Sequence, residues 1–195
     1  MKTLASRITT LTDARYFAAK EVDFLGFRIE EQMDGFIDPM HVKAIREWVE
    51  GPAILGEFDR FSHESVRETI GFLGLDGAVV GPDFSTNSLF GLSGLRVFRE
   101  ISEKNPAKLA AQMAVEKDLV EAFLLDADQF SGDFLGEMAA QFPIFIKTLA
   151  GPDEILAFSK KINPAGIVFT GGDEEQVGLR SFDEIEAVFE VLEIG

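Results

Sequence analysis

The stretch VEAFLLDADQFSGDFLGEMAAQFPIFIKTLAGPDEILAFSKKINPAGIVFT, residues 120–170, contains three short apolar runs separated by two segments of helical character. The apolar runs, Val120–Asp126, Ile144–Leu149 and Gly166–Thr170, are each long enough for one buried strand. Apolar strands that alternate with helices are typical of a parallel sheet with helical crossovers, covered on both of its faces. This stretch therefore predicts parallel strands joined by helices.

The same alternation extends toward the N-terminus. Further strands are predicted at Thr3–Ile8, Phe24–Ile29, Ala53–Phe58, Leu75–Val80 and Leu92–Ile101. Helices are predicted at Thr12–Val22, after Asp38-Pro39, at Ser62–Gly71, Asn105–Lys117 and Gly132–Phe142, after Gly151-Pro152, and after the capping box Ser181–Glu184, with a weak fourth helix in Pro82–Gly91. Eight such units predict a single small (β/α)8 barrel over residues 1–195, since the competing doubly wound open sheet has fewer strands at this length.

The amino-acid composition limits the kinds of partner that this protein is expected to bind. The chain has a formal net charge of −16, so we expect neither a nucleic-acid nor a membrane partner, because both carry negative charge. It has no cysteine and two histidines, which excludes disulfides and thiolate zinc sites and predicts no metal. The N-terminus has no apolar run typical of a signal peptide, so a cytoplasmic protein is expected. A monomer or a homodimer is compatible with the composition.

In a (β/α)8 barrel, the site is expected at the C-terminal ends of the strands. The polar residues assigned to those ends are Ser6, Arg7, Arg28, Glu57, Asp59, Arg96, Arg99, Asp126, Asp128, Lys147 and Thr170-Gly171-Gly172. Each one alone can be a solvated or ion-paired surface charge. Together they favour a polar pocket that binds a small molecule, and nothing in the pattern requires a cofactor.

Two of these positions suggest specific chemistry. Asp126 ends a strongly apolar strand and is a candidate general acid or base, with structural capping of the following loop as the rival explanation. Thr170-Gly171-Gly172 follows the last strand, where many barrels bind phosphate through backbone N–H groups. The acidic run Asp173–Glu175 directly after it opposes phosphate binding by charge repulsion.

The order of segments resembles phosphoribosylanthranilate isomerase, the small (β/α)8 enzyme of tryptophan biosynthesis, over nearly the whole chain. The resemblance is carried by Leu4–Thr9 (family K-I-C-G-I-T), Asp13-Ala14 (E-D-A), Asp23–Phe27 (A-D-A-L-G-F), Phe36–Pro39 (Y-I-S-P), Leu55–Phe58 (V-G-V-F), Gly74–Asp76 (G-L-D), Arg96–Arg99 (K-A-I-R), Leu124–Asp126 (L-L-D) and Gly178–Arg180 (G-V-K). It implies an Amadori rearrangement without a cofactor, in which Asp126 is the general acid. The base of the family is a cysteine on the first strand, and Ser6 occupies its position.

Other family positions are changed as well. Gly35 stands where the family has an arginine that binds the substrate carboxylate, and Lys147-Thr148-Leu149 replaces its A-G-G phosphate turn. Its S-S-G turn remains as Thr170-Gly171-Gly172. An isolated serine is a much poorer base than a thiolate. The resemblance therefore implies an isomerase-like protein whose activity on a small metabolite, phosphorylated or not, is lost or altered.

Three functions stay open at this point. In the first, Arg7, Arg28, Arg99 and Lys147 supply positive charge for substrate and Asp126 the acid, in a divergent isomerase. The second is a non-catalytic barrel that binds a partner or regulates one. The third is a lyase or aldolase with Lys147 as a Schiff-base lysine, which requires a desolvated amine.

Overall fold

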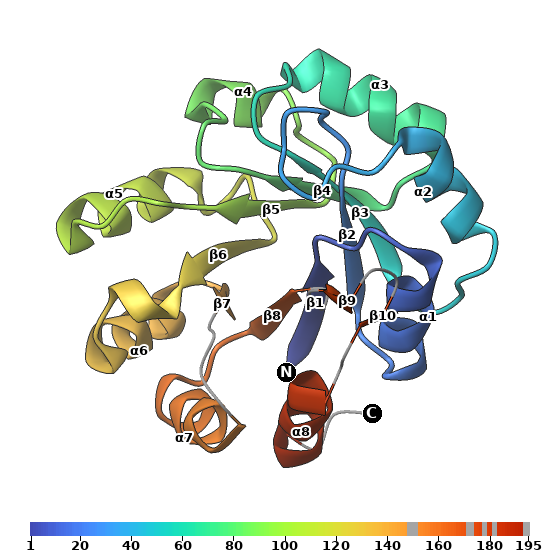
Figure 1. Cartoon of the computed structure of the whole chain (residues 1–195). Helices are drawn as coiled ribbons and strands as arrows, with labels where there is room; N and C mark the ends of the chain where they lie inside the picture. Colours follow the sequence, from blue (N-terminus) through green and yellow to red (C-terminus); the bar gives the residue numbers. More distant parts are fainter. Residues whose placement is uncertain (148–151, 171–173, 177–178, 181–182, 193–195) are drawn as a thin grey trace.

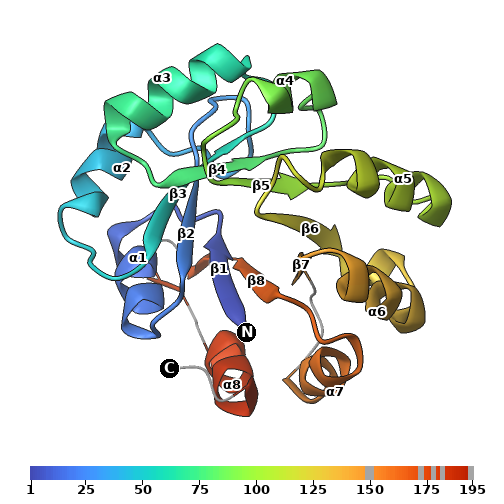
Figure 2. The ribbon, with the colours of Figure 1, turned by 180° about the vertical axis from the view of Figure 1, so that it is seen from behind.

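The computed structural model describes residues 1–147, 152–170, 174–176, 179–180 and 183–192. Eight parallel strands follow one another in sequence order, and β8 pairs with β1, which closes the sheet into a barrel. The helices lie around the outside of the ring of strands in both views (Figure 1, Figure 2). The predicted (β/α)8 barrel is confirmed.

The barrel strands are short and mostly apolar. They are β1 Lys2–Ser6, β2 Phe24–Arg28, β3 Ala53–Phe58, β4 Gly77–Val80, β5 Val97–Glu100, β6 Ala122–Asp126, β7 Ile144–Lys147 and β8 Gly166–Thr170. A two-stranded antiparallel sheet, β9 Glu174–Gln176 and β10 Leu179–Arg180, comes between β8 and the last helix and was not predicted.

The helices begin where the sequence offers capping side chains. They are α1 Leu11–Ala19, α2 Pro39–Arg46, α3 His63–Leu73, α4 Thr86–Phe90, α5 Pro106–Glu116, α6 Gly132–Gln141, α7 Pro152–Ile162 and α8 Asp183–Leu192, with the short 3-10 turn η1 Ala127–Gln129 after β6. Asp38, Ser62 and Asn105 each accept a hydrogen bond from a backbone N–H of the first turn. The expected weak fourth helix is the five-residue α4.

Alternate strand residues point into the barrel and fill it. The inward apolar cluster consists of Leu4, Phe24, Leu55, Val79, Phe98, Ala122, Leu124, Phe145 and Val168. Phe98 lies edge-on to Phe24 and Phe145, with ring centroids 4.9 and 5.5 Å away, so aromatic rings occupy the N-terminal half of the interior. The other alternate residues pack outward against the helices.

The fifth strand is shorter than predicted, and this changes the place of Arg96. The prediction began that strand at Leu92, whereas β5 begins at Val97. Arg96 therefore lies at the N-terminal end of the barrel, where its Nε donates to Glu121 at 2.7 Å. Its assignment to the C-terminal rim is wrong. Among the residues that the structure describes, no helix has both the length and the apolar character needed to cross a membrane.

Candidate functional site

Seven polar side chains form the last inward-pointing layer of the barrel at the C-terminal ends of the strands, which we call the mouth. They are Ser6, Arg28, Glu57, Glu100, Asp126, Lys147 and Thr170. Strand pairing fixes this layer, because Ser6 pairs with Thr170, Arg28 with Glu57, and Asp126 with Lys147. Ser6 and Asp126 thus lie at the same end of one closed barrel.

Among the described residues of this layer, Glu57 takes part in the most hydrogen bonds. It lies on β3 and is 4% exposed. The Ser6 hydroxyl donates to its Oε1 at 2.7 Å, and the Nε of Arg28 donates to its Oε2 at 3.2 Å. A carboxylate taken out of water needs such partners, because desolvation of an unpaired charge costs several kcal/mol. Ser6, Glu57 and Arg28 therefore form one connected polar cluster.

The segment between β2 and α2 is tied to this cluster by two arginines. Arg28 Nη1 donates to the backbone oxygen of Asp34 at 2.7 Å, and the guanidinium of Arg7 forms an ion pair with the Asp34 carboxylate. Arg7 has a φ of 60°, a left-handed conformation that costs a residue with a Cβ about 1–2 kcal/mol. Its backbone N–H donates to Glu57 Oε1 at 3.1 Å. The cluster therefore joins β1, β2 and β3 to the β2–α2 segment.

Lys147 forms the second ion pair of the mouth. Its ammonium group is paired with the Glu100 carboxylate, which comes from the end of β5. Both side chains are about one-third exposed, at 34% and 28%. A Schiff-base lysine needs a desolvated amine, and a lysine that is paired with a carboxylate and partly exposed does not provide one. The geometry therefore does not favour a Schiff base at Lys147.

Asp126 caps the turn that follows β6. Its Oδ1 accepts from the backbone N–H of Asp128 at 3.1 Å, and its Oδ2 accepts from the side-chain amide of Gln129 at 2.9 Å. β6 ends at Asp126, so Asp128 belongs to η1 and does not share the face of the strand. The capping role is thus present in the structure, and it leaves Asp126 partly exposed at the mouth.

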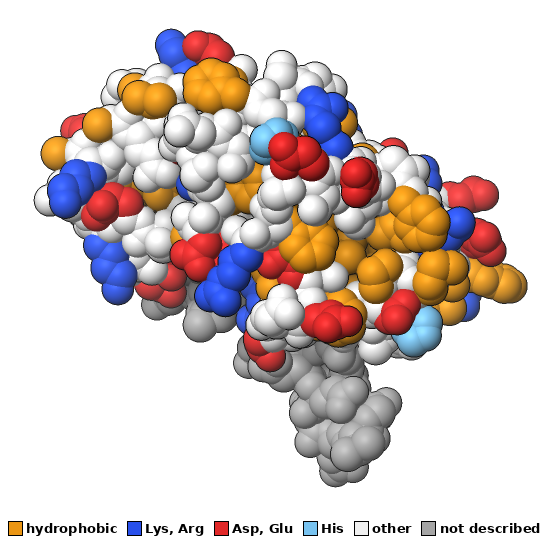
Figure 3. Space-filling view, turned by 90° about the horizontal axis from the view of Figure 1, so that it is seen from above, with side chains coloured by type: hydrophobic (Ala, Val, Ile, Leu, Met, Phe, Trp, Pro, Cys, Tyr) orange, Lys and Arg blue, Asp and Glu red, His pale blue; other side chains and the backbone are white. Residues whose placement is uncertain are grey.

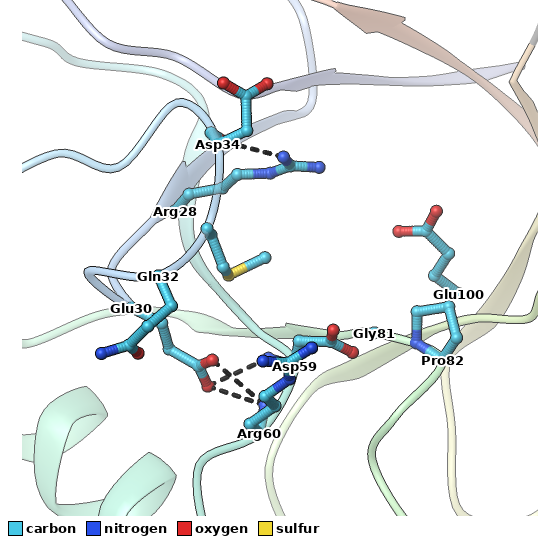
Figure 4. Close-up of a pocket in the computed structure, with 10 residues that line it drawn as sticks. Arg28, Glu30, Gln32, Asp34, Asp59, Arg60, Gly81, Pro82 and Glu100 are labelled. Atoms are coloured by element: carbon cyan, nitrogen blue, oxygen red, sulfur yellow. Dashed lines mark hydrogen bonds between the residues drawn. The ribbon is translucent and has the colours of Figure 1, made fainter.

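A cavity of about 250 Å³ opens on the β2–β5 side of the mouth (Figure 4). Its lining residues are Arg28, Glu30, Gln32, Met33, Asp34, Asp59, Arg60, Gly81, Pro82 and Glu100. Figure 4 shows Arg28 and Glu100 approaching this space from β2 and β5. The volume is just below the usual range of small-molecule sites, about 300–1,000 Å³. A compact polar metabolite matches this space in size and chemistry.

The floor of this cavity is held by Glu30, which is 1% exposed. Its carboxylate accepts hydrogen bonds from the backbone N–H groups of Asp59, Arg60 and Phe61, at 2.7–3.1 Å. Three successive N–H groups that converge on one anion fix the backbone after β3. Glu30 therefore supports the rim segment that carries Asp59.

Arg99 does not belong to the mouth, contrary to the prediction. It pairs with Val80 and Phe123, two outward-facing residues, and so points away from the barrel interior. The side chain is 2% exposed; its Nε donates to Glu116 at 3.2 Å, and its Nη1 donates to the backbone oxygen of Gly81. The prediction was wrong because the K-A-I-R resemblance does not tell which alternate residue faces inward.

The structure describes only part of the predicted phosphate turn. Thr170 ends β8 and is exposed, next to Ser6 in the sheet register. Gly171 and Gly172 lie outside the described residues, as do Thr148 and Leu149 after β7. In the part of the chain that the structure describes, no three histidine, aspartate or glutamate side chains are grouped so as to hold a metal ion.

Glu57 is the residue whose importance the sequence reading missed. It was placed among the polar residues at strand ends but was given no role. The available signal was spacing: Glu57 is two residues from Leu55 on an apolar strand, so both face the same side. A charged residue on the inward face in the C-terminal half of a barrel strand must lie in the mouth or be unpaired inside the core.

The sequence matches no protein-family model and no curated protein. Its structure is similar to phosphoribosylanthranilate isomerase from Thermotoga maritima, with a TM-score of 0.83 and 14% identity, and from Thermus thermophilus, with a TM-score of 0.81 and 21% identity. Both comparisons cover 99% of this chain and 98% of the other.

A further isomerase structure, solved with reduced 1-(o-carboxyphenylamino)-1-deoxyribulose 5-phosphate, has a TM-score of 0.83 and 15% identity over the same shares of the two chains. Identities this low establish architecture alone. The chain therefore has the (β/α)8 barrel fold of the phosphoribosylanthranilate isomerases.

Proposed function

We propose that this protein is a divergent relative of phosphoribosylanthranilate isomerase that binds a small polar metabolite at the barrel mouth and has lost efficient turnover of the isomerase substrate. The fold and the order of segments support the relationship. The left-handed backbone of Arg7 supports it further, because Arg7 stands where the resembled sequence has glycine, the residue for which this conformation is easiest.

The observation that carries the loss of efficiency is the contact of Ser6. Ser6 stands at the position of the family's cysteine base, and its hydroxyl proton is directed at the Glu57 carboxylate. A serine in this arrangement donates a hydrogen bond and does not accept a proton from carbon. Loss of the general base from its place on the first strand typically lowers the rate on the isomerase substrate about 10²–10⁴-fold.

The remaining site residues have the following proposed roles. Asp126 is the general acid, and Arg7, Arg28 and Lys147 bind polar or anionic groups of the ligand. Each of these cations is already paired, with Asp34, Glu57 and Glu100 respectively, so a phosphate must compete with a carboxylate of the protein. Thr170-Gly171-Gly172 stays a proposed phosphate turn. The pairing favours a ligand with few negative charges.

Binding without turnover is the expected behaviour. The melting temperature is measured with D-ribose 5-phosphate, with anthranilate and with reduced 1-(o-carboxyphenylamino)-1-deoxyribulose 5-phosphate, each in excess. A ligand present at 100 times its Kd stabilises by about 2.7 kcal/mol, which raises the Tm of a chain this long by about 5–10 °C.

At least one sugar phosphate should raise the Tm of the wild type and not that of Arg28→Ala, which removes a cation lining the cavity. The matched control is Arg67→Ala, because the exposed Arg67 lies on α3 and donates to the backbone oxygens of Gly91 and Ser93. No shift with any compound would contradict a metabolite site. Equal shifts in both arginine variants would place it outside the mouth.

A second function, a barrel that binds a protein partner, is favoured by one surface feature. Trp48 is 72% exposed and Met40 on α2 is 54% exposed, beside a groove of about 270 Å³ that Ile37 and Ile45 help to line. In the space-filling view from above, several hydrophobic side chains lie close together on the right of the molecule, with acidic and basic side chains at their edges (Figure 3). If this function holds, Trp48→Ser should change the oligomeric state in sedimentation, while Phe90→Ser, at a comparable exposure on α4, should not.

A further inference from the structure

In the part of the chain that the structure describes, three donors hold the Glu57 carboxylate, and they are unevenly divided between its two oxygens. Oε1 accepts from the Ser6 hydroxyl and from the Arg7 N–H, at 2.7 and 3.1 Å. Among the described residues, Arg28 alone donates to Oε2, at 3.2 Å. A carboxylate oxygen has two lone-pair positions, so Oε1 is saturated and Oε2 keeps one position for another partner.

The backbone around Glu57 is shaped to bring this carboxylate into the barrel. Gly26 on β2 faces inward directly beneath it, and a Cβ at that position would lie 2.2 Å from Oε1. A contact of that length is impossible, so any larger residue at position 26 would displace the carboxylate. The Glu57 carboxylate lies closer to the mouth than the apolar layer formed by Leu55 and its inward neighbours.

We propose that Glu57 is the proton-accepting group of the mouth, with Ser6, Arg7 and Arg28 as the residues that position it. This inference rests on the proposed function, in which a small polar metabolite binds at the mouth, and it adds that the metabolite is a carbonyl compound. The general base would then lie on the third strand, whereas the resembled family has it on the first. Ser6 orients the new carboxylate through its hydroxyl and is not itself the base.

The chemistry balances for the interconversion of a 2-hydroxy aldehyde and its ketone. Glu57 Oε2 removes the proton from C2, the electron pair of that C–H bond forms a C1=C2 double bond, and the carbonyl oxygen takes a proton from Asp126. The neutral Glu57 then returns its proton to C1, and the Asp126 carboxylate takes the proton of the C2 hydroxyl. Both carboxyl groups end in their starting states, and no oxidant or reductant is needed.

Exchange of carbon-bound hydrogen with solvent measures this step directly. D-Ribulose 5-phosphate and 1-(o-carboxyphenylamino)-1-deoxyribulose 5-phosphate are incubated with the protein in D₂O, and loss of the C1 proton signals is followed by NMR. The wild type should exchange at least one of them faster than buffer. Glu57→Gln should lower that rate about 10²–10⁴-fold, the usual contribution of a general base.

Two companion variants separate a base from a structural carboxylate. Glu57→Asp, which keeps the acid, should retain more exchange than Glu57→Gln. Ser6→Ala should lower exchange less than Glu57→Gln and shift its pH profile, because it removes one donor to the same carboxylate. The matched control is Glu121→Gln at the opposite end of the barrel, where Glu121 accepts hydrogen bonds from Lys2 and Arg96. It should leave exchange unchanged. Circular dichroism and Tm check that each variant folds.

The outcomes separate this inference from the proposed function. If folded Glu57→Gln exchanges as fast as wild type, Glu57 is structural and the proposed function stands. If the wild type binds a sugar phosphate but exchanges neither compound, the base role is wrong while binding at the mouth stands. If it neither binds nor exchanges, both proposals fail together.

Discussion

The two ends of the barrel use the same kinds of side chain for different purposes. At the N-terminal end, Glu121 accepts from Lys2 at 3.2 Å and from Arg96 at 2.7 Å. Both cations also lie over the ring of Phe24, 5.4 and 5.6 Å from its centre. Inside the barrel, the rings of Phe98 and Phe145 lie against the ring of Phe24. These charges cover an aromatic plug, so this end of the barrel is filled.

At the mouth one member of each ion pair, Arg28 and Glu100, lines a cavity. Glu57 is held by Arg28, and Glu100 by Lys147, and residues of the β2–α2 segment take part through Asp34. In (β/α)8 barrels the C-terminal end carries the chemistry, while the N-terminal end contributes to stability. Both ends of the barrel have ion pairs, so an ion pair alone does not indicate function. What indicates function is whether the pair covers a filled core or borders a cavity.

The largest expected effect is on stability, at the filled end. Phe98→Ala removes the ring that contacts both Phe24 and Phe145 and leaves a cavity, so it should destabilise by about 3–5 kcal/mol. Urea unfolding measures this loss. Phe90→Ala, on a ring that is 59% exposed, should change stability by less than about 0.5 kcal/mol. A loss below about 1 kcal/mol for Phe98→Ala would show that the aromatic layer is not tightly packed.

The ion pair of Arg99 tests whether buried charges near the mouth contribute to stability. Glu116 is fully buried, and Glu116→Gln leaves the Arg99 guanidinium buried without its carboxylate, so it should cost about 3 kcal/mol. Glu121→Gln, in partly exposed pairs, should cost no more than about 1 kcal/mol. Equal losses in urea unfolding would show that Arg99 is hydrated and available to a ligand after all.

Gly26 tests the support of the mouth. Gly26→Ala forces the Glu57 carboxylate away, and overpacking of this kind should cost about 1–3 kcal/mol. In a Glu57→Ala background the same change should cost clearly less, because the atom that clashes is gone. A double-mutant cycle by urea unfolding measures this coupling. Additive losses would mean that Gly26 serves another neighbour.

The smallest expected effect is a dependence of stability on pH at the contact between α1 and α8. The hydrogen bond from Lys20, and next the one from Tyr16, holds the pKa of Glu186 below its ordinary value of 4.5. Since the folded pKa is the lower one, this contribution is present above pH 4.5 and is lost as pH falls through the lowered pKa. The Tm difference between wild type and Glu186→Gln should vanish in acid. A difference that persists at pH 2 would contradict this.

The sequence was informative about the fold because the strands are apolar and regularly spaced. AFLLD and GIVFT were predicted with the bounds of β6 and β8 within two residues, and the polar ends of β1, β2, β6 and β7 were assigned to the mouth. The weak fourth helix followed from the turn-forming residues of Pro82–Gly91.

The site was less predictable, because side-chain direction depends on single-residue register. Arg96 and Arg99 were assigned to the mouth, but β5 begins at Val97, which leaves Arg96 below it and turns Arg99 outward. The contact between Ser6 and Glu57 joins residues 51 positions apart. Spacing along the chain does not reveal such a contact until the strands are placed side by side.

The most direct measurement of the central claim is kcat/KM for phosphoribosylanthranilate, determined side by side for the wild type and for Ser6→Cys. The wild type should fall far below the ordinary range of about 10⁴–10⁸ M⁻¹s⁻¹. Ser6→Cys should not restore it, because Glu57 still lies against the side chain at position 6 and Gly35 still replaces the arginine for the carboxylate. A wild-type value inside that range, or recovery into it by this one substitution, would contradict the account.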